Sequence, residues 1–194
     1  MRPPVVSLAA LVGIVGIAAC SGGQGTPAAS ALASGPYTYS AAAFSLNNCN
    51  FAHGNAAAYN GSRQTLGTSG AGITFEGADP ILPLGTTATL TATVSGQAFL
   101  APTMNVPTDW TTTAGQISSG INPPLKHGFA CQELDTYALS GSITGNNQFT
   151  RLTDVNFTLV SGTAAECIAA INTLYGFGLT QFPCESKLSL NGAM

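Results

Sequence analysis

The side chains best suited to chemistry lie in two short segments of the chain. Residues 49–53 read Cys-Asn-Phe-Ala-His, and residues 127–131 read His-Gly-Phe-Ala-Cys, which is nearly the same order reversed. His53 and His127 are the only two histidines. Cysteine with histidine is typical of a zinc site or of a nucleophile with its base, and two cysteines alone can form a disulfide. Three kinds of site are therefore open.

An antiparallel pairing of these segments favours the disulfide. Opposed residues then have numbers with a constant sum, and three pairs share it: Cys49 with Cys131, Phe51 with Phe129, and His53 with His127. On one strand, a cysteine and a histidine four residues apart lie about 13 Å apart, which is too far to share one zinc ion. We therefore predict a Cys49–Cys131 bond with both phenylalanines packed in the core. Convergence of all four Cys and His side chains would favour zinc instead.

Acidic residues close in sequence are a second candidate for chemistry. Glu133 and Asp135 flank Leu134, and Glu76 lies close to Asp79. Paired carboxylates can serve glycoside hydrolysis. Acids two or three residues apart more often solvate a turn, which is the alternative for both pairs.

The single tryptophan, Trp110, follows Asp109 in a polar, loop-like stretch and precedes three threonines. An aromatic ring beside an acid and hydroxyl groups is a common arrangement in carbohydrate sites. The alternative is a tryptophan that fills one end of the core. Asp109 and Trp110 are our candidate ligand-binding residues, and in an enzyme His127 would join them.

Composition and motifs exclude several classes of protein. Charged residues make up 7% of the chain, against about 25% in a typical globular domain. The five Lys and Arg residues are too few to build the basic patch that nucleic acid requires, so we expect no nucleic-acid partner. The sequence contains no Gly-x-Ser-x-Gly, no His-Glu-x-x-His and no phosphate-binding glycine loop. We expect no metal and no cofactor.

The N-terminal segment predicts export and a lipid anchor. Residues 5–19 form an apolar run of 15 residues, shorter than the roughly 20 that span a bilayer but suited to a secretory signal. Ile17-Ala18-Ala19-Cys20 resembles the lipobox of bacterial lipoproteins. The resemblance implies cleavage before Cys20, lipidation of its thiol and stable membrane anchoring by several acyl chains. The alternative is an ordinary cleaved signal followed by a chance cysteine.

The same resemblance indicates a location and divides the chain. Ser21, in place of an aspartate, resembles outer-membrane lipoproteins of Gram-negative bacteria, so we expect the protein in the cell envelope, anchored to the outer membrane. Residues 1–19 would be the signal peptide, and the small, polar residues 20–36 predict a flexible tether. Residues 37–194 suffice for one buried core and are too few for two ordinary domains, so we predict a single β-rich domain.

With Cys20 carrying lipid, four cysteines remain, which are Cys49, Cys131, Cys167 and Cys184. An even number of cysteines in an exported protein indicates two disulfides. If Cys49 bonds Cys131, the chain between Cys167 and Cys184 needs only to turn back, and we predict that these two are bonded.

Period-2 alternation predicts several short strands. In residues 86–94, threonines alternate with Ala88, Leu90, Ala92 and Val94. The same pattern recurs in four segments, whose apolar residues are Ile73 and Phe75, then Tyr137, Leu139 and Ile143, then Val155, Phe157 and Leu159, and finally Leu188 and Leu190.

Residues 163–175 predict the one helix. Thr163 followed by Glu166 forms a capping-box pattern, Ile168 and Ile171 follow at helical spacing, and Gly176 ends the segment. Many short strands and one late helix predict a mainly β fold, either a two-sheet sandwich or an open barrel.

Taken together, these features predict a lipid-anchored binding or assembly module of the cell envelope, whose partner is an envelope protein or a glycan. The alternative is a lipid-anchored hydrolase, directed at carbohydrate, that uses Asp109, Trp110 and His127. Convergence of two acids and His127 in one cleft would favour the hydrolase. Dispersal of the acids over turns would favour the module.

Overall fold

A computed structural model describes residues 31–81, 87–110 and 129–194. The strands in this part of the chain are β1 (Gly35–Asn47), β2 (Arg63–Ser69), β3 (Gly72–Ala78), β4 (Thr87–Ser95), β5 (Ala98–Leu100), β6 (Met104–Asp109), β7 (Cys131–Gly145), β8 (Gln148–Gly162) and β9 (Cys184–Ala193). The helical segments are the short 3₁₀ turns η2 (Phe51–Gly54) and η3 (Ala56–Tyr59) and the helix α1 (Ala164–Tyr175). The fold is mainly β with one α-helix, as predicted.

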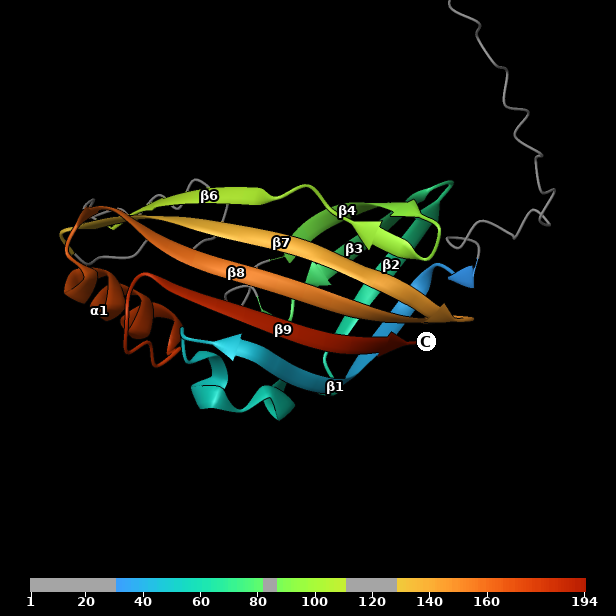
Figure 1. The fold of residues 1–194 in the computed structure, drawn as a ribbon, viewed down its shortest axis with the longest axis horizontal. Coiled ribbons are helices and arrows are strands. Elements are labelled where there is room, and N and C mark those ends of the chain that lie inside the picture. The colour runs from blue at the N-terminus through green and yellow to red at the C-terminus, as the bar shows by residue number, and fades with distance from the viewer. Residues whose placement is uncertain (1–30, 82–86, 111–128) are drawn as a thin grey trace, which may run out of the picture.

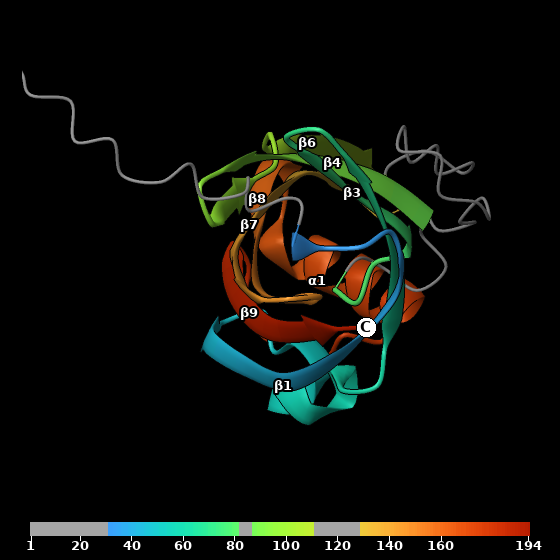
Figure 2. The same ribbon diagram turned by 90° about the vertical axis from the view of Figure 1, so that its right-hand side faces the viewer.

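The strands form a closed antiparallel barrel. Their order is β5-β4-β3-β2-β1-β9-β8-β7-β6, and β5 also pairs with β7, which closes a ring of eight strands. The remaining strand, β6, pairs with β7 beyond β5, so both strands share one edge of β7. Figure 2 shows this ring from one end. The two-sheet sandwich was therefore a wrong prediction, and the open barrel was wrong because β5 completes the ring.

The closure depends on a glycine opposite β5. Phe99 of β5 faces Gly141 of β7, and the Phe99 ring is buried inside the barrel. A Cβ atom added to Gly141 would overlap that ring and the carbonyl oxygen of Thr150. The sequence alone marks Gly141 only as a weak point in a strand, so the ring closure could not be read from it.

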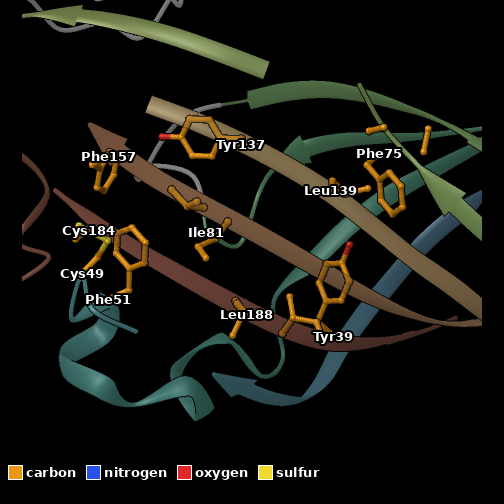
Figure 3. Close-up of a cluster of buried hydrophobic side chains, with 14 of the residues drawn as sticks. Tyr39, Cys49, Phe51, Phe75, Ile81, Tyr137, Leu139, Phe157, Cys184 and Leu188 are labelled. Atoms are coloured by element: carbon orange, nitrogen blue, oxygen red, sulfur yellow. A yellow bond between two sulfur atoms is a disulfide. The ribbon is translucent and has the colours of Figure 1, made fainter. Parts of the chain in front are cut away.

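The predicted alternation of apolar residues is confirmed. On β7, Tyr137, Leu139 and Ile143 are buried, while the residues between them are half-buried or exposed. Most of the residues predicted to face the core on the other strands are buried too, namely Ile73, Phe75, Ala92, Val155, Phe157, Leu188 and Leu190. Leu90, Val94 and Leu159 are half-buried and pack against this core. Figure 3 shows labelled side chains from different strands gathered in this core, among them Phe75, Leu139, Phe157 and Leu188.

The predicted helix is confirmed as α1. The hydroxyl oxygen of Thr163 accepts a hydrogen bond from the backbone N–H of Glu166 at 3.3 Å, which caps the helix at its start. Gly176 ends it with a positive φ of 64°. The helix lies across one end of the barrel, and the C-terminal end of β9 lies at the other end (Figures 1 and 2).

The four cysteines form two disulfides, but the predicted pairing is wrong. Cys49 bonds Cys184 with a Cα separation of 5.1 Å, and Cys131 bonds Cys167 with a Cα separation of 5.4 Å. Residues 49–53 could not pair as a strand because the chain turns there, with Ala52 at a φ of 49°. Instead, the start of β9 lies beside the end of β1, and α1 folds back against the start of β7.

The opposed histidines predicted by that pairing are not observed. His53 lies in η2, where a Cβ atom built on Gly178 would come within 2.7 Å of its ring. His127 and Cys20 lie outside the described residues, as do residues 1–19 and most of the predicted tether. The last residues of the predicted tether belong to the folded part, because Leu32 is buried and β1 begins at Gly35. Within the described part, no helix is long and apolar enough to span a membrane.

Candidate functional site

Two carboxylic acids lie inside the barrel at the end covered by α1. Glu133 is 2% exposed and Asp135 is 8% exposed. They occupy alternate positions on β7 and therefore face the interior together with Tyr137. The expectation that closely spaced acids solvate a turn was wrong here, because the segment is a strand whose odd positions point inward. We call Glu133 and Asp135 the acid pair.

Neighbouring strands enclose the acid pair with aromatic, aliphatic and hydroxyl groups. On one side, Thr108 of β6 lies opposite Glu133 and Val106 lies opposite Asp135. On the other side, Phe157 of β8 lies opposite Asp135. Phe157 contacts further rings, since its centroid lies 5.7 Å from that of Phe51 and 6.5 Å from that of Phe182.

Each member of the acid pair accepts one hydrogen bond from the β6 side. The indole N–H of Trp110 donates to Oε1 of Glu133 at 2.8 Å. The hydroxyl of Thr108 donates to the carboxylate of Asp135. The other oxygens, Oε2 of Glu133 and Oδ1 of Asp135, are buried and have no hydrogen-bond partner among the described residues. An unsatisfied buried acceptor is costly, so these two oxygens mark a site at which a donor is missing.

The acid pair also lacks a positive partner in the described chain. Burial raises the pKa of Glu133 to about 7, although the Trp110 hydrogen bond opposes this shift. Burial raises the pKa of Asp135 well above its usual value, and the nearby charge of Glu133 adds to the effect, while the Thr108 hydrogen bond opposes it. Near neutral pH the pair therefore holds bound protons in place of a counter-ion.

The side chains of the predicted binding residues Asp109 and Trp110 have different surroundings and different hydrogen-bond partners. Asp109 is half-buried and accepts a hydrogen bond from the side-chain amide of Gln132 at 3.0 Å. Trp110 is 3% exposed, and its acidic neighbour is Glu133 rather than Asp109. Strand alternation could have placed Glu133 and Asp135 inside the fold, because they share the period of Tyr137 and Leu139.

A second buried polar cluster surrounds Arg151 on β8. Its guanidinium forms an ion pair with Asp79, and the same group donates to the side-chain oxygen of Gln64 at 2.8 Å and to the hydroxyl of Tyr39 at 3.2 Å. Its Nε donates to the hydroxyl of Thr153 at 3.0 Å. No sequence motif marks Arg151, although it lies between Phe149 and Thr153 at the inward-facing positions of β8.

A small cavity adjoins this second cluster. About 10 Å³ is open to the centre of a water molecule, which is space for about one water. Arg151, Asp79, Tyr137 and Met104 are among the residues that line it. Arg151 and Asp79 neutralise each other, so this cluster has no unpaired charge, although Nε2 of Gln64 is buried without a hydrogen-bond partner among the described residues.

No cluster of three or more His, Cys, Asp and Glu residues that could hold a metal occurs in residues 31–81, 87–110 and 129–194. Two candidate zinc ligands, Cys49 and Cys131, are held in disulfides. The acid pair offers two carboxylates and one nearby hydroxyl, which is fewer than the six to eight oxygens that calcium prefers.

Comparison with known proteins found no relative. No protein-family model matches the chain, and no match was found among curated proteins or among solved structures. The structure thus defines the protein by its architecture: a closed eight-stranded barrel with an extra strand, one helix across an end and two disulfides.

Proposed function

We propose that the protein is a lipid-anchored module of the bacterial cell envelope that binds a ligand inside the α1 end of its barrel. The observation that carries the binding proposal is the acid pair beside Trp110, in which two buried oxygens have no donor among the described residues. Small eight-stranded barrels have an interior just wide enough for packed side chains or one small ligand. The lipobox-like residues 17–20 support the anchor.

The positions of the chain ends support this arrangement. The backbone N–H of Ala33 donates to the side chain of Asn147 at 2.8 Å, and the backbone N–H of Met194 donates to the carbonyl of Asn147 at 3.3 Å. The tether therefore joins the barrel at the β7–β8 hairpin, whereas α1 and β6 lie at the opposite end (Figure 1). A lipid on Cys20 would leave the α1 end directed away from the membrane.

The binding proposal is tested by analysing what the protein carries. The full chain is purified from envelopes in mild detergent, and bound small molecules are extracted and identified by mass spectrometry. We expect a compound that accompanies the wild type and the surface variant Glu76→Gln, and that is absent from Glu133→Gln/Asp135→Asn. Equal recovery of the compound from all three proteins would contradict ligand binding at the acid pair.

The anchoring proposal has a separate test. Cys20→Ala removes the thiol that would carry the lipid, so the variant should accumulate as an unlipidated precursor or a soluble product. Phase separation in detergent measures the change, and Cys20→Ala partitioning like the wild type would rule out the lipid anchor.

A lipid-anchored hydrolase is the second candidate function. It is favoured by the burial of two carboxyls on one face of β7, which raises the pKa of Glu133 to about 7. A general acid works best with its pKa near the working pH. Among the described residues the acid would be Glu133 rather than Asp109, because Asp109 is not beside the acid pair. Hydrolysis of a panel of chromogenic glycosides by the wild type, lost in Glu133→Gln, would support this candidate.

A further inference from the structure

We propose that the ligand of the acid pair is an organic ammonium ion, a primary or secondary amine attached to an apolar body. This inference rests on the proposed binding function and names the chemical class of the ligand. It follows from three properties of the site as the described residues form it, which are that two carboxylate oxygens lack a donor, that no positive charge faces them and that the walls are apolar.

The missing donors and charge come from an inventory of the ionisable groups inside the barrel. Asp79 and Arg151 form an ion pair and neutralise each other. Glu133 and Asp135 have no ion pair with a described residue, and each has one oxygen without a donor. Burial of a carboxylate without a partner is strongly unfavourable. A bound group that supplies both N–H donors and a positive charge would relieve both deficits.

The number of donors fits an ammonium group. A primary ammonium carries three N–H donors and no acceptor. The acid pair offers two oxygens with no partner in the part of the chain that the structure describes, and Asp135 and Glu133 each have a second oxygen that already accepts a single bond. Carboxylate oxygens have two acceptor positions each, so a third N–H can be shared. A carboxylate or phosphate ligand would supply neither the N–H donors nor the positive charge.

The walls of the site fit an organic rather than a bare ion. Trp110 and Phe157 are almost fully buried beside the acid pair, and Val106 faces the same interior. Aromatic rings attract an ammonium through their negative faces, and they bury the carbon atoms attached to it. A small metal ion would gain little from these rings and, in the described residues, would find no third acidic, His or Cys ligand.

The test uses Trp110, which is the only tryptophan in the chain and bonds Glu133 directly. The full-length protein in detergent is titrated with 2-phenylethylamine, 1,5-diaminopentane and spermidine, and tryptophan emission and melting temperature are both recorded. Controls are 2-phenylethanol, which has the same body without the ammonium, and calcium chloride. We expect saturable binding of at least one amine, at least tenfold tighter than binding of the alcohol.

Variants assign the binding to the acid pair. Asp135→Asn keeps the Trp110–Glu133 hydrogen bond and removes one carboxyl, so it should bind the amine at least tenfold more weakly. Because Trp110 is retained, its emission still measures amine binding in this variant. Glu76→Gln, which removes an exposed acid on β3, should bind as the wild type does. A melting transition and circular dichroism spectrum like those of the wild type establish that Asp135→Asn is folded; if it is not, Asp135→Ser takes its place.

Several outcomes would overturn the inference. These are no response to any amine at millimolar concentration, equal binding of 2-phenylethylamine and 2-phenylethanol, or saturation by calcium alone. The extraction experiment separates this inference from the binding function. A neutral or anionic compound that depends on the acid pair would refute the ammonium ligand and leave ligand binding intact, whereas absence of any compound together with no amine response would refute both.

Discussion

Trp110 donates its indole N–H to Oε1 of Glu133 across 2.8 Å, and this bond links the end of β6 to the start of β7 inside the barrel. The bond couples the only fluorophore of its kind in the chain to a carboxyl whose pKa burial raises to about 7. We therefore expect protonation of Glu133 to change the emission of Trp110, which would report the electrostatics of the acid pair without a label.

The first prediction concerns pH. Because the pKa of Glu133 rises from its usual 4.5 to about 7 on folding, its contribution to stability is complete below 4.5 and is lost as the pH rises through 7. Wild-type emission should change with a midpoint near pH 7. The free energy of unfolding should fall over the same interval by roughly 3 kcal/mol relative to Glu133→Gln, since one pKa unit corresponds to about 1.4 kcal/mol.

Emission titrations and urea unfolding at several pH values check this prediction. The matched control is Glu185→Gln, which removes a half-buried acid on β9 that faces Lys187. An unchanged midpoint near pH 7 in Glu133→Gln would show that another group titrates.

The second prediction concerns the ion pair of Arg151 and Asp79. Both side chains are fully buried, so Arg151→Met leaves the carboxylate of Asp79 buried without its partner. We expect Arg151→Met to lose about 3–5 kcal/mol of unfolding free energy, as measured for buried pairs in which one partner is removed. The double variant Arg151→Met/Asp79→Asn should recover part of that loss because no unpaired charge remains. A double variant less stable than the single one would contradict this account.

The third prediction concerns the disulfide that fastens α1. Non-reducing peptide mapping should link Cys131 to Cys167 and Cys49 to Cys184. Cys131→Ser/Cys167→Ser opens a loop closed over a sequence separation of 36, which should lower stability by about 4 kcal/mol in the chain-entropy model. A Cys49–Cys131 peptide in the map would show that the observed pairing is wrong.

The fourth prediction concerns ring closure. Gly141→Ala forces a Cβ atom into the Phe99 ring and the backbone at Thr150, which should cost about 1–3 kcal/mol as overpacking does elsewhere. Gly67→Ala is the control, because its added Cβ would meet only the Cβ of Thr74 at 3.7 Å, an ordinary contact. Thermal unfolding distinguishes them, and equal stability of the two variants would mean that β5 and β7 separate easily.

The local features were predictable because each depends on nearby residues. Alternation predicted Tyr137 and Leu139 in the core, where the structure has them. The Thr163 cap and Gly176 predicted both ends of the helix to within one residue. The disulfide pairing depends instead on which distant elements meet. The mirrored segments suggested Cys49 opposite Cys131, but Cys131 lies opposite Gly162, because β8 is the neighbour of β7 on that side.

The candidate site was predicted only in part. Trp110 was singled out beside Asp109 because they adjoin in sequence, whereas Trp110 is buried against Glu133 of the adjacent strand. The strand period predicts that the side chains of Asp135 and Glu133 face inward. That they are almost fully buried depends on the closure of the ring. Ring closure in turn depends on β5, a strand of three residues that sequence patterns do not reveal.

β5 is also the strand at which we expect the barrel to open locally. It forms three residue pairs with β4 and three with β7, while β7 and β8 pair along nearly their whole length. Amide hydrogens exchange with solvent through the openings that cost least free energy, and those openings break the fewest contacts. The slowest-exchanging amides should therefore lie on β7, β8 and β9, and the fastest within the ring on β5. The other seven strands of the ring then form one continuous arc that β5 alone closes, so release of β5 would separate β4 from β7 without unfolding the arc.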